Sequence, residues 1–313
     1  MTQAYQYPQS NMRAEQFKLD VWHGLAQQKK VLSHDWALDQ HGMNLLARLY
    51  QQPEYYAARV EAAILADYAQ DIAVEVGHHA LVVEYGCEHW LRTTALLDQL
   101  LKPQAYVGVC ASIETRNSYQ IELQYRYRKL PVELLDGSLQ EPLPRNWHGH
   151  GNCVIYIPGS MLGRITHQQA LNVMRQVRSF GAKLLVGIDL VKDAEVLEAA
   201  YNDRSHLQQA LNLNILKRAN RELAADFDVN GYYHKASYNR ITHSVESYLV
   251  SLATQKVSVA GQQFKLSIAE PIFTGAHRKF SLPDMESMAD AADWQLQRTW
   301  MDDKRWFALQ LFH

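Results

Sequence analysis

Residues 80–110 read ALVVEYGCEHWLRTTALLDQLLKPQAYVGVC, and this stretch decides the fold. The apolar run at 80–84 predicts a buried strand that ends at Gly86, and residues 105–110 predict a second strand of the same kind. Between them, residues 91–101 have the pattern of a helix that stops before Pro103. Strand, helix and strand in this order predict a βαβ unit with parallel strands.

The same alternation continues along the chain. Further strands are predicted at 132–135, 152–157 and 183–189, with helices at 113–128 and 167–180. Strands separated by helices of about 10–15 residues form a parallel sheet. Such sheets bind ligands at the carboxyl ends of their strands, so we expect a nucleotide-type site there.

The flanking sequence follows other patterns. Residues 42–70 predict two helices interrupted at Pro53, and residues 194–223 predict one long helix. Alternating segments predict antiparallel strands at 243–251, 255–259 and 264–268, and a closing hairpin at 294–300 and 305–312. We therefore expect a parallel α/β domain interrupted by an α+β insertion.

Composition excludes several classes of protein. The 313 residues are 47% apolar and 20% charged, which is typical of a globular chain. The 31 Lys and Arg against 33 Asp and Glu leave no basic excess for nucleic-acid binding. No run approaches the length of a membrane helix, and the N-terminus lacks the apolar core of a signal peptide. Three cysteines cannot build a disulfide framework, so we expect a reducing compartment, the cytoplasm.

Several longer segments resemble one family. They are QQPEYYAARVEAAIL at 51–65, LLVGIDLVKDAEVLEAAYND at 184–203, ALNLNILKRANREL at 210–223, and WMDD with FALQLF at 300–312. In this order the chain resembles the class I S-adenosylmethionine (SAM) methyltransferases, and more narrowly the histidine Nα-methyltransferases of ergothioneine biosynthesis.

The resemblance implies a fold and a division into domains. The fold would be a Rossmann-like class I methyltransferase sheet with an inserted α+β substrate-binding domain. The methyltransferase-like domain would comprise residues 61–195 and 286–313, and the inserted domain residues 196–285. Residues 1–60 would be a helical segment that contributes to the substrate domain.

The resemblance also implies where SAM would bind. The family's first loop reads roughly E-L-G-S-G-S-S-x-K-T, and this chain has EYGCEHWLRT at 84–93. Gly86 matches, and Arg92 replaces the lysine. Glu88 replaces the second glycine, which lets the backbone approach the cofactor. Two interpretations of Glu88 follow. In the first, its carboxylate selects a cationic ligand or excludes SAM. In the second, the loop turns outward and Glu88 lies in solvent.

Three further positions follow the next two strands. The aspartate that accepts from the ribose hydroxyls in the family is Cys110 here, and a thiol is a weak acceptor. Asp136 and Gly137 keep the pair that reaches the adenine region in the family.

Cys87 and Cys110 would follow neighbouring strands. Packing of two small residues is the simpler interpretation, and a redox pair or two metal ligands at the cofactor mouth is the alternative.

The substrate residues implied by the resemblance are also altered. Tyr56 and Tyr201 match substrate-site tyrosines of the family. Arg164 stands where an asparagine grips the amino-acid carboxylate, and an arginine could hold that group bidentately. The family's T-E-x-S, which orients the imidazole, reads TGAH at 274–277, so His277 replaces the serine. Free histidine is therefore not the expected substrate.

Three functions remain open from the sequence. The first is a divergent SAM-dependent N-methyltransferase of a small amino acid or amine. The second is a catalytically degenerate member that acts as a binding or regulatory subunit with a protein partner. The third is a different group transfer, as in a natural-product pathway.

Overall fold

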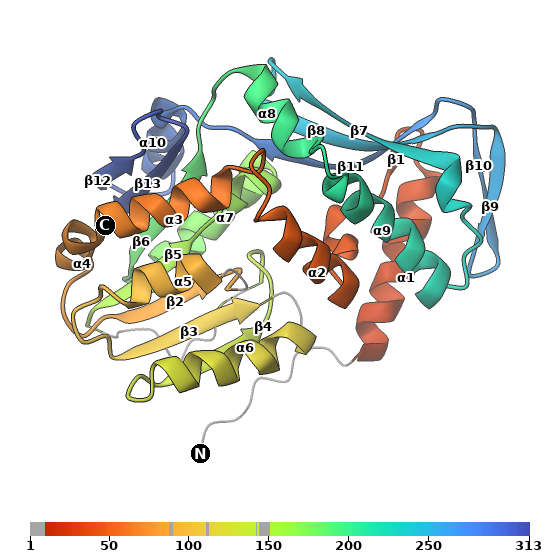
Figure 1. Cartoon of the computed structure of the whole chain (residues 1–313). Helices are drawn as coiled ribbons and strands as arrows, with labels where there is room; N and C mark the ends of the chain where they lie inside the picture. The colour runs from red at the N-terminus through yellow and green to blue at the C-terminus, as the bar shows by residue number, and fades with distance from the viewer. Residues whose placement is uncertain (1–9, 88–89, 111–112, 142, 144–150) are drawn as a thin grey trace. The chain divides into compact units, whose positions relative to one another are not determined.

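Two compact units make up the chain (Figure 1). The computed structural model describes residues 10–87, 90–110, 113–141, 143 and 151–313. Unit 1 comprises Met1–Tyr55 and Asp193–His277, and unit 2 comprises Tyr56–Lys192 and Arg278–His313. Among the described residues, none of the helices has the length and hydropathy needed to cross a membrane.

Unit 2 is built on a seven-stranded sheet with the order β12-β13-β6-β5-β2-β3-β4. Its strands are β2 (Leu81–Tyr85), β3 (Ala105–Cys110), β4 (Val132–Asp136), β5 (Cys153–Ile157), β6 (Lys183–Asp189), β12 (Leu296–Met301) and β13 (Phe307–Phe312). The strands from β6 to β4 are parallel, and β13 runs antiparallel to both β6 and β12. The expected α/β class with a largely parallel sheet is confirmed, as is the closing hairpin.

Helices cover both faces of this sheet, which is why its strands read as continuous apolar runs. On one face, Val83 and its neighbours pack with α7 (His167–Arg178) and α10 (Leu282–Asp290). On the other face, Val82 and its neighbours pack with four helices. These are α3 (Ala57–Asp67), α4 (Ala69–Val76), α5 (Trp90–Leu97) and α6 (Ile113–Arg126).

Unit 1 has its own sheet and core. The sheet order is β1 (Lys30–Val31), β11 (Pro271–Arg278), β8 (Ser244–Ser251) and β7 (Tyr232–Asn239). A separate hairpin joins β9 (Gln255–Val259) to β10 (Gln262–Leu266). The helices are α1 (Ser10–Ala26), α2 (Gln40–Leu49), α8 (Ala194–Tyr201) and α9 (Leu207–Glu222).

The predicted single helix at 194–223 is wrong, because the chain breaks between α8 and α9. Asp203 lies in the break, and its carboxylate accepts from the backbone N–H groups of Leu207 (2.9 Å) and Gln208 (2.7 Å). His206 there has a left-handed φ of 55°. The side chain of Asp203 therefore begins a new helix by satisfying its first free donors.

Candidate functional site

The carboxyl ends of β2, β3 and β4 lie at one edge of the unit 2 sheet. The Gly86 N–H donates to Val109 O (2.8 Å), and the Gly137 N–H donates to Cys110 O (3.0 Å). Asp136 pairs in register with Cys110. Gly86 has a φ of 62°, which favours glycine. Gly86, Cys110, Asp136 and Gly137 are thus brought to one edge, as expected for a cofactor crevice, while Glu88 lies outside the described residues.

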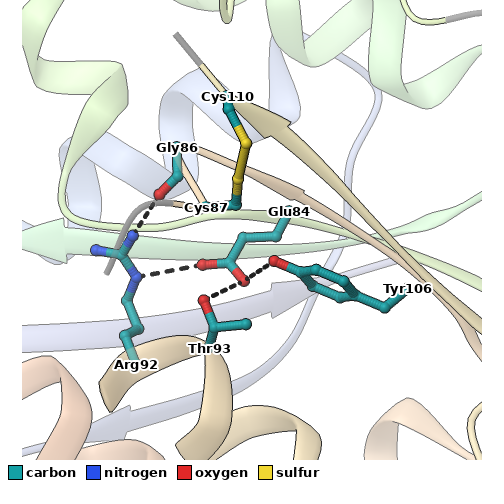
Figure 2. The surroundings of a disulfide bond; sticks show 7 residues. All are labelled: Glu84, Gly86, Cys87, Arg92, Thr93, Tyr106 and Cys110. Carbon is teal, nitrogen blue, oxygen red and sulfur yellow. Dashed lines mark hydrogen bonds and ion pairs between the residues drawn. A yellow bond between two sulfur atoms is a disulfide. The ribbon is translucent and has the colours of Figure 1, made fainter. Parts of the chain in front are cut away.

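Arg92 lies beneath this edge and holds the Gly86 loop. Its Nη2 donates to the Gly86 carbonyl at 2.7 Å, and its Nε lies 3.4 Å from Glu84 Oε1 (Figure 2). Its Nη1 lies 3.5 Å from Glu61 Oε2. Only 5% of Arg92 is exposed. The guanidinium therefore links the loop carbonyl to two buried carboxylates.

Each of those carboxylates has further donors. Glu84 Oε2 accepts from the hydroxyls of Thr93 (2.9 Å) and Tyr106 (2.9 Å), as Figure 2 shows. Glu61 Oε1 accepts from the Tyr156 hydroxyl (2.8 Å), and both Glu61 oxygens accept from the Gly159 N–H (3.0 Å). These hydrogen bonds offset part of the cost of burying the charges.

One guanidinium cannot balance two buried carboxylates. Burial raises the pKa of Glu84 to about 7 against the opposing effect of Arg92, and it also raises the pKa of Glu61. Burial is the main cause of the raised pKa of Glu84, repulsion from Glu61 adds to it, and the arginine that the two acids share opposes it. The cluster therefore has a protonation state that changes in the physiological range.

Cys87 and Cys110 form a disulfide directly beside Gly86 (Figure 2). Their Cα atoms are 5.6 Å apart, and both residues are buried in the core against α5. The packing interpretation is therefore wrong, and the sulfurs do not lie at an open mouth. A disulfide sulfur has no hydrogen to donate and accepts only weakly. At the position of the expected ribose acceptor, the chain thus has a covalent cross-link.

Arg164 follows β5 on the short 3₁₀ helix Met161–Arg164 and is half-buried. Ser160, which begins this turn, has a left-handed φ of 56° and is 8% exposed. Within the part of the chain that is described, the Ser160 hydroxyl has no hydrogen-bond partner. The turn that carries Arg164 therefore also presents a buried polar group that sequence reasoning missed.

Tyr56 begins unit 2 in a cluster with Asp189 and two lysines. Its hydroxyl donates to Asp189 Oδ1 (2.7 Å) and accepts from Lys192 Nζ (2.8 Å). Lys192 Nζ also lies 4.6 Å from the centre of the Tyr56 ring. Lys279 Nζ donates to Asp189 Oδ2 at 2.7 Å. The cluster fixes the Tyr56 ring at the carboxyl end of β6.

The charges in this cluster are buried but paired. Burial favours a neutral Asp189, yet the adjacent Lys279 and Lys192 ammonium groups hold its pKa below the ordinary value. Burial lowers the pKa of Lys192 despite Asp189. Asp302 also acts on Lys192, so Asp189 is not the only carboxylate that stabilises the charge of this lysine among the described residues.

Two other predicted residues, Tyr201 and His277, lie together in unit 1. Their ring centres are 4.9 Å apart, and His277 lies edge-on to His34 with 6.3 Å between ring centres. Tyr201 is buried at the end of α8, and its carbonyl contacts His234 Nε2 at 2.8 Å. Burial lowers the pKa of His234, so this ring favours its neutral form.

Sequence reasoning missed several residues that shape these clusters: Glu61, Glu84, Asp189, Lys192, Lys279 and His34. Two of these residues are acids at the end of an apolar run: Glu84 in LVVE and Asp189 in LLVGID. A charge at the end of a buried strand was the sign in the sequence that could have pointed to them. Some of their partners are close in the chain, as Lys192 is to Asp189, but others are far away, as Lys279 is, and those pairings could not be read from spacing. Among the described residues, no three His, Cys, Asp or Glu side chains are arranged to hold a metal ion.

The chain is similar to known methyltransferases over nearly its whole length. Residues 17–313 match the family model described as histidine-specific methyltransferase, SAM-dependent. A histidine N-alpha-methyltransferase of Mycobacterium tuberculosis is 31% identical, with 93% of each chain covered. The Mycolicibacterium smegmatis enzyme of the same name is 29% identical over 97% of each chain.

More distant relatives carry a broader name. The N-methyltransferase dtpB of Aspergillus flavus is 22% identical over 95% of this chain and 88% of its own. The family model covers almost all of both units, including every predicted site residue. The chain therefore belongs to the histidine-specific, SAM-dependent methyltransferase family.

Proposed function

We propose that this protein is a SAM-dependent N-methyltransferase of a small amino acid or amine other than free histidine. Family membership supports this proposal, as does the edge of the unit 2 sheet at which Gly86, Cys110 and Gly137 lie together. SAM would supply an electrophilic methyl group. The protein would contribute mainly alignment and a suitable electrostatic environment.

Three places in unit 2 would contact SAM: the Gly86 loop, Asp136 with Gly137, and the ribose position at Cys110. The first two are compatible with SAM. The left-handed Gly86 loop permits close backbone approach, and Asp136 with Gly137 ends the strand next to it. At the ribose position, the Cys87–Cys110 disulfide replaces a carboxylate acceptor. Losing charge-assisted hydrogen bonds of about 1.5–3 kcal/mol each weakens binding roughly 10- to 100-fold per bond. We therefore expect a lower affinity than a carboxylate would give.

On the substrate side, Arg164 would hold a carboxylate, since a guanidinium binds that group through paired hydrogen bonds. Tyr56 would face the amine, in the place that Asp189 and Lys192 fix for it. Tyr201 and His277, which the resemblance also gives as substrate residues, lie together in unit 1.

The specificity follows from strand β11. Gly275 has no side chain, so this position of the strand carries no carboxylate. A Cβ added at Gly275 would lie 3.5 Å from His34 Cβ. Imidazole rings from His34 and His277 occupy this part of unit 1. In the family's motif a glutamate at this position orients the imidazole of the substrate, and Gly275 offers no carboxylate for that role, while each neutral histidine ring offers one donor and one acceptor nitrogen. Free histidine is accordingly disfavoured.

A direct assay tests the proposal. Purified protein would be incubated with SAM and a panel of amino acids and amines that includes histidine, and the mass gain of one methyl group recorded. We expect transfer to a carboxylate-bearing amine other than histidine, with a sharp loss in Arg164→Gln and none in the exposed Arg204→Gln. Transfer to histidine as the best substrate, or to nothing in the panel, would contradict the proposal.

The disulfide supports a second candidate, a non-catalytic binding subunit. If the cross-link has replaced the ribose acceptor without another group taking that role, the cofactor would no longer bind. Calorimetry with S-adenosylhomocysteine separates the two candidates. An absence of heat and of any thermal shift would favour the binding subunit, and the Glu88→Gly/Cys110→Asp variant should then gain affinity.

A further inference from the structure

The Cys87–Cys110 cross-link has a prepared place in the fold. Gly108 precedes Cys110 on β3, and a Cβ there would lie 2.8 Å from Cys87 Cβ and 2.9 Å from Cys87 Sγ. It would also lie 2.6 Å from Leu134 Cδ2. Distances this short are not tolerated, so only glycine at position 108 leaves room for the Cys87 side chain. The contact with Cβ would arise with any residue except glycine at position 87, whereas the contact with Sγ is specific to the cysteine.

The cross-link acts on the backbone that faces the expected cofactor. Cys87 directly follows Gly86, whose N–H and carbonyl are held by Val109 and Arg92. Cys110 ends β3, and its carbonyl accepts from Gly137. A bond between the two sulfurs therefore joins the loop after β2 to the strand end beside it.

We propose that Cys87 and Cys110 form a reversible disulfide that positions the Gly86 loop, so that the affinity for a SAM-type nucleoside depends on the oxidation state of this pair. This inference rests on the proposed function for its ligand. The two cysteines are positioning residues, because they act through the backbone of Gly86.

The chemistry needs an external oxidant, a low-molecular-weight disulfide. The thiolate of one cysteine attacks it, forms a mixed disulfide and releases one small thiol. The second cysteine then attacks the protein sulfur of the mixed disulfide and releases the second small thiol. The two protein thiols lose two electrons and two protons, which the two small thiols carry away. Both sulfurs are buried, so we expect slow exchange in the folded chain.

The test compares oxidised and reduced full-length protein. The chain would be equilibrated in buffers of reduced and oxidised dithiothreitol, and the free thiols counted by alkylation and mass spectrometry. The affinity for S-adenosylhomocysteine would be measured by calorimetry in the same buffers. A loop residue that reduction releases must be ordered again when the ligand binds, so we expect roughly tenfold weaker binding after reduction.

Variants separate positioning from general stability. Cys87→Ser/Cys110→Ser should bind like the reduced chain in every buffer, whereas Cys153→Ala removes the free buried cysteine and should keep the full redox response. The midpoint of the affinity change should coincide with the midpoint of thiol oxidation, and re-oxidation should restore binding. Equal affinity in both states, or three free thiols instead of one in the oxidising buffer, would overturn the inference.

Hydrogen exchange provides a readout without any ligand. Reduction should accelerate exchange of the Gly86 N–H, which the oxidised loop donates to Val109. If no form binds the nucleoside but this exchange accelerates, the proposed function fails while the positioning of the loop by the disulfide stands. Unchanged exchange after reduction would refute that positioning.

Discussion

At the scale of single residues, the buried acids beside Arg92 show how one cation serves two carboxylates. Glu84 and Glu61 reach it from different elements, β2 and α3, and each also accepts hydrogen bonds from neutral hydroxyls. Replacing such a cluster by apolar side chains can be neutral, but removing only the cation leaves charges unpaired. Arg92 also donates to the Gly86 carbonyl. The position of the Gly86 loop therefore depends on the protonation of Glu84 and Glu61, the two acids that hold this arginine.

The raised pKa of Glu84 predicts a pH-dependent stability. Its pKa is about 7 in the folded chain against an ordinary 4.5, so the folded state holds the proton longer. The free energy of unfolding should thus fall as pH rises from about 4.5 to about 7, by at most about 3 kcal/mol from this group. Glu84→Gln should lack that decline in denaturant titrations, and the exposed Glu133→Gln should keep it. A parallel decline in both variants would contradict the assignment.

Gly108 gives a second prediction at this scale. Gly108→Ala places a methyl group against Cys87 and Leu134, so it should cost about 1–3 kcal/mol of stability and leave both cysteines open to alkylation. Gly151→Ala, where nothing lies within 4 Å of the added carbon, is the matched control. A Gly108→Ala chain that keeps the disulfide and full stability would argue against a built site.

At the scale of elements, the strands of unit 2 could be predicted because burial on both faces makes them continuous apolar runs. The resemblance implied a helical segment over residues 1–60, but the bounds of helix α1 were not predicted, because its buried residues, Phe17, Val21 and Leu25, recur only every fourth position in a polar segment. The sequence left the bond between Cys87 and Cys110 as an alternative, a redox pair, because the distance between two sulfurs on neighbouring strands leaves no local signal. Long-range pairings such as Arg92 with Glu61 likewise leave no local signal.

The break between α8 and α9 carries a prediction for an element. Asp203→Ala should remove two hydrogen bonds to the first turn of α9 and cost about 1–2 kcal/mol. Asp203→Asn keeps an acceptor oxygen and should lose less. Thermal unfolding followed by circular dichroism would measure both, and equal stability of Asp203→Ala and the parent would show that α9 begins without this cap.

At the scale of the whole molecule, each unit carries its own core and its own group of predicted residues. Unit 2 holds the strand ends at Gly86, Cys110 and Asp136 together with Tyr56 and Arg164, and unit 1 holds Tyr201 and His277. Unit 2 is also the one with the covalent cross-link. Redox state should therefore change the stability of unit 2 selectively.

The disulfide closes a loop between residues 23 positions apart, and such a loop restricts the unfolded chain by about 3 kcal/mol. Oxidised protein should thus unfold at a higher denaturant concentration than reduced protein. The Cys153→Ala variant, which keeps the disulfide, should show the same difference between its oxidised and reduced forms. Chevron or equilibrium titrations with and without reductant would measure the difference. Superimposable curves would mean that the link adds nothing to unit 2.

Strand β13 has a consequence for biosynthesis. It fills the place between β6 and β12, yet it lies more than a hundred residues downstream of β6. A growing polypeptide therefore exposes the open edge of β6 while unit 1 residues are being translated, for on the order of 10 s. An unpaired apolar edge invites intermolecular pairing, so nascent chains of this protein should depend on holdase chaperones more than chains whose sheets close in sequence order.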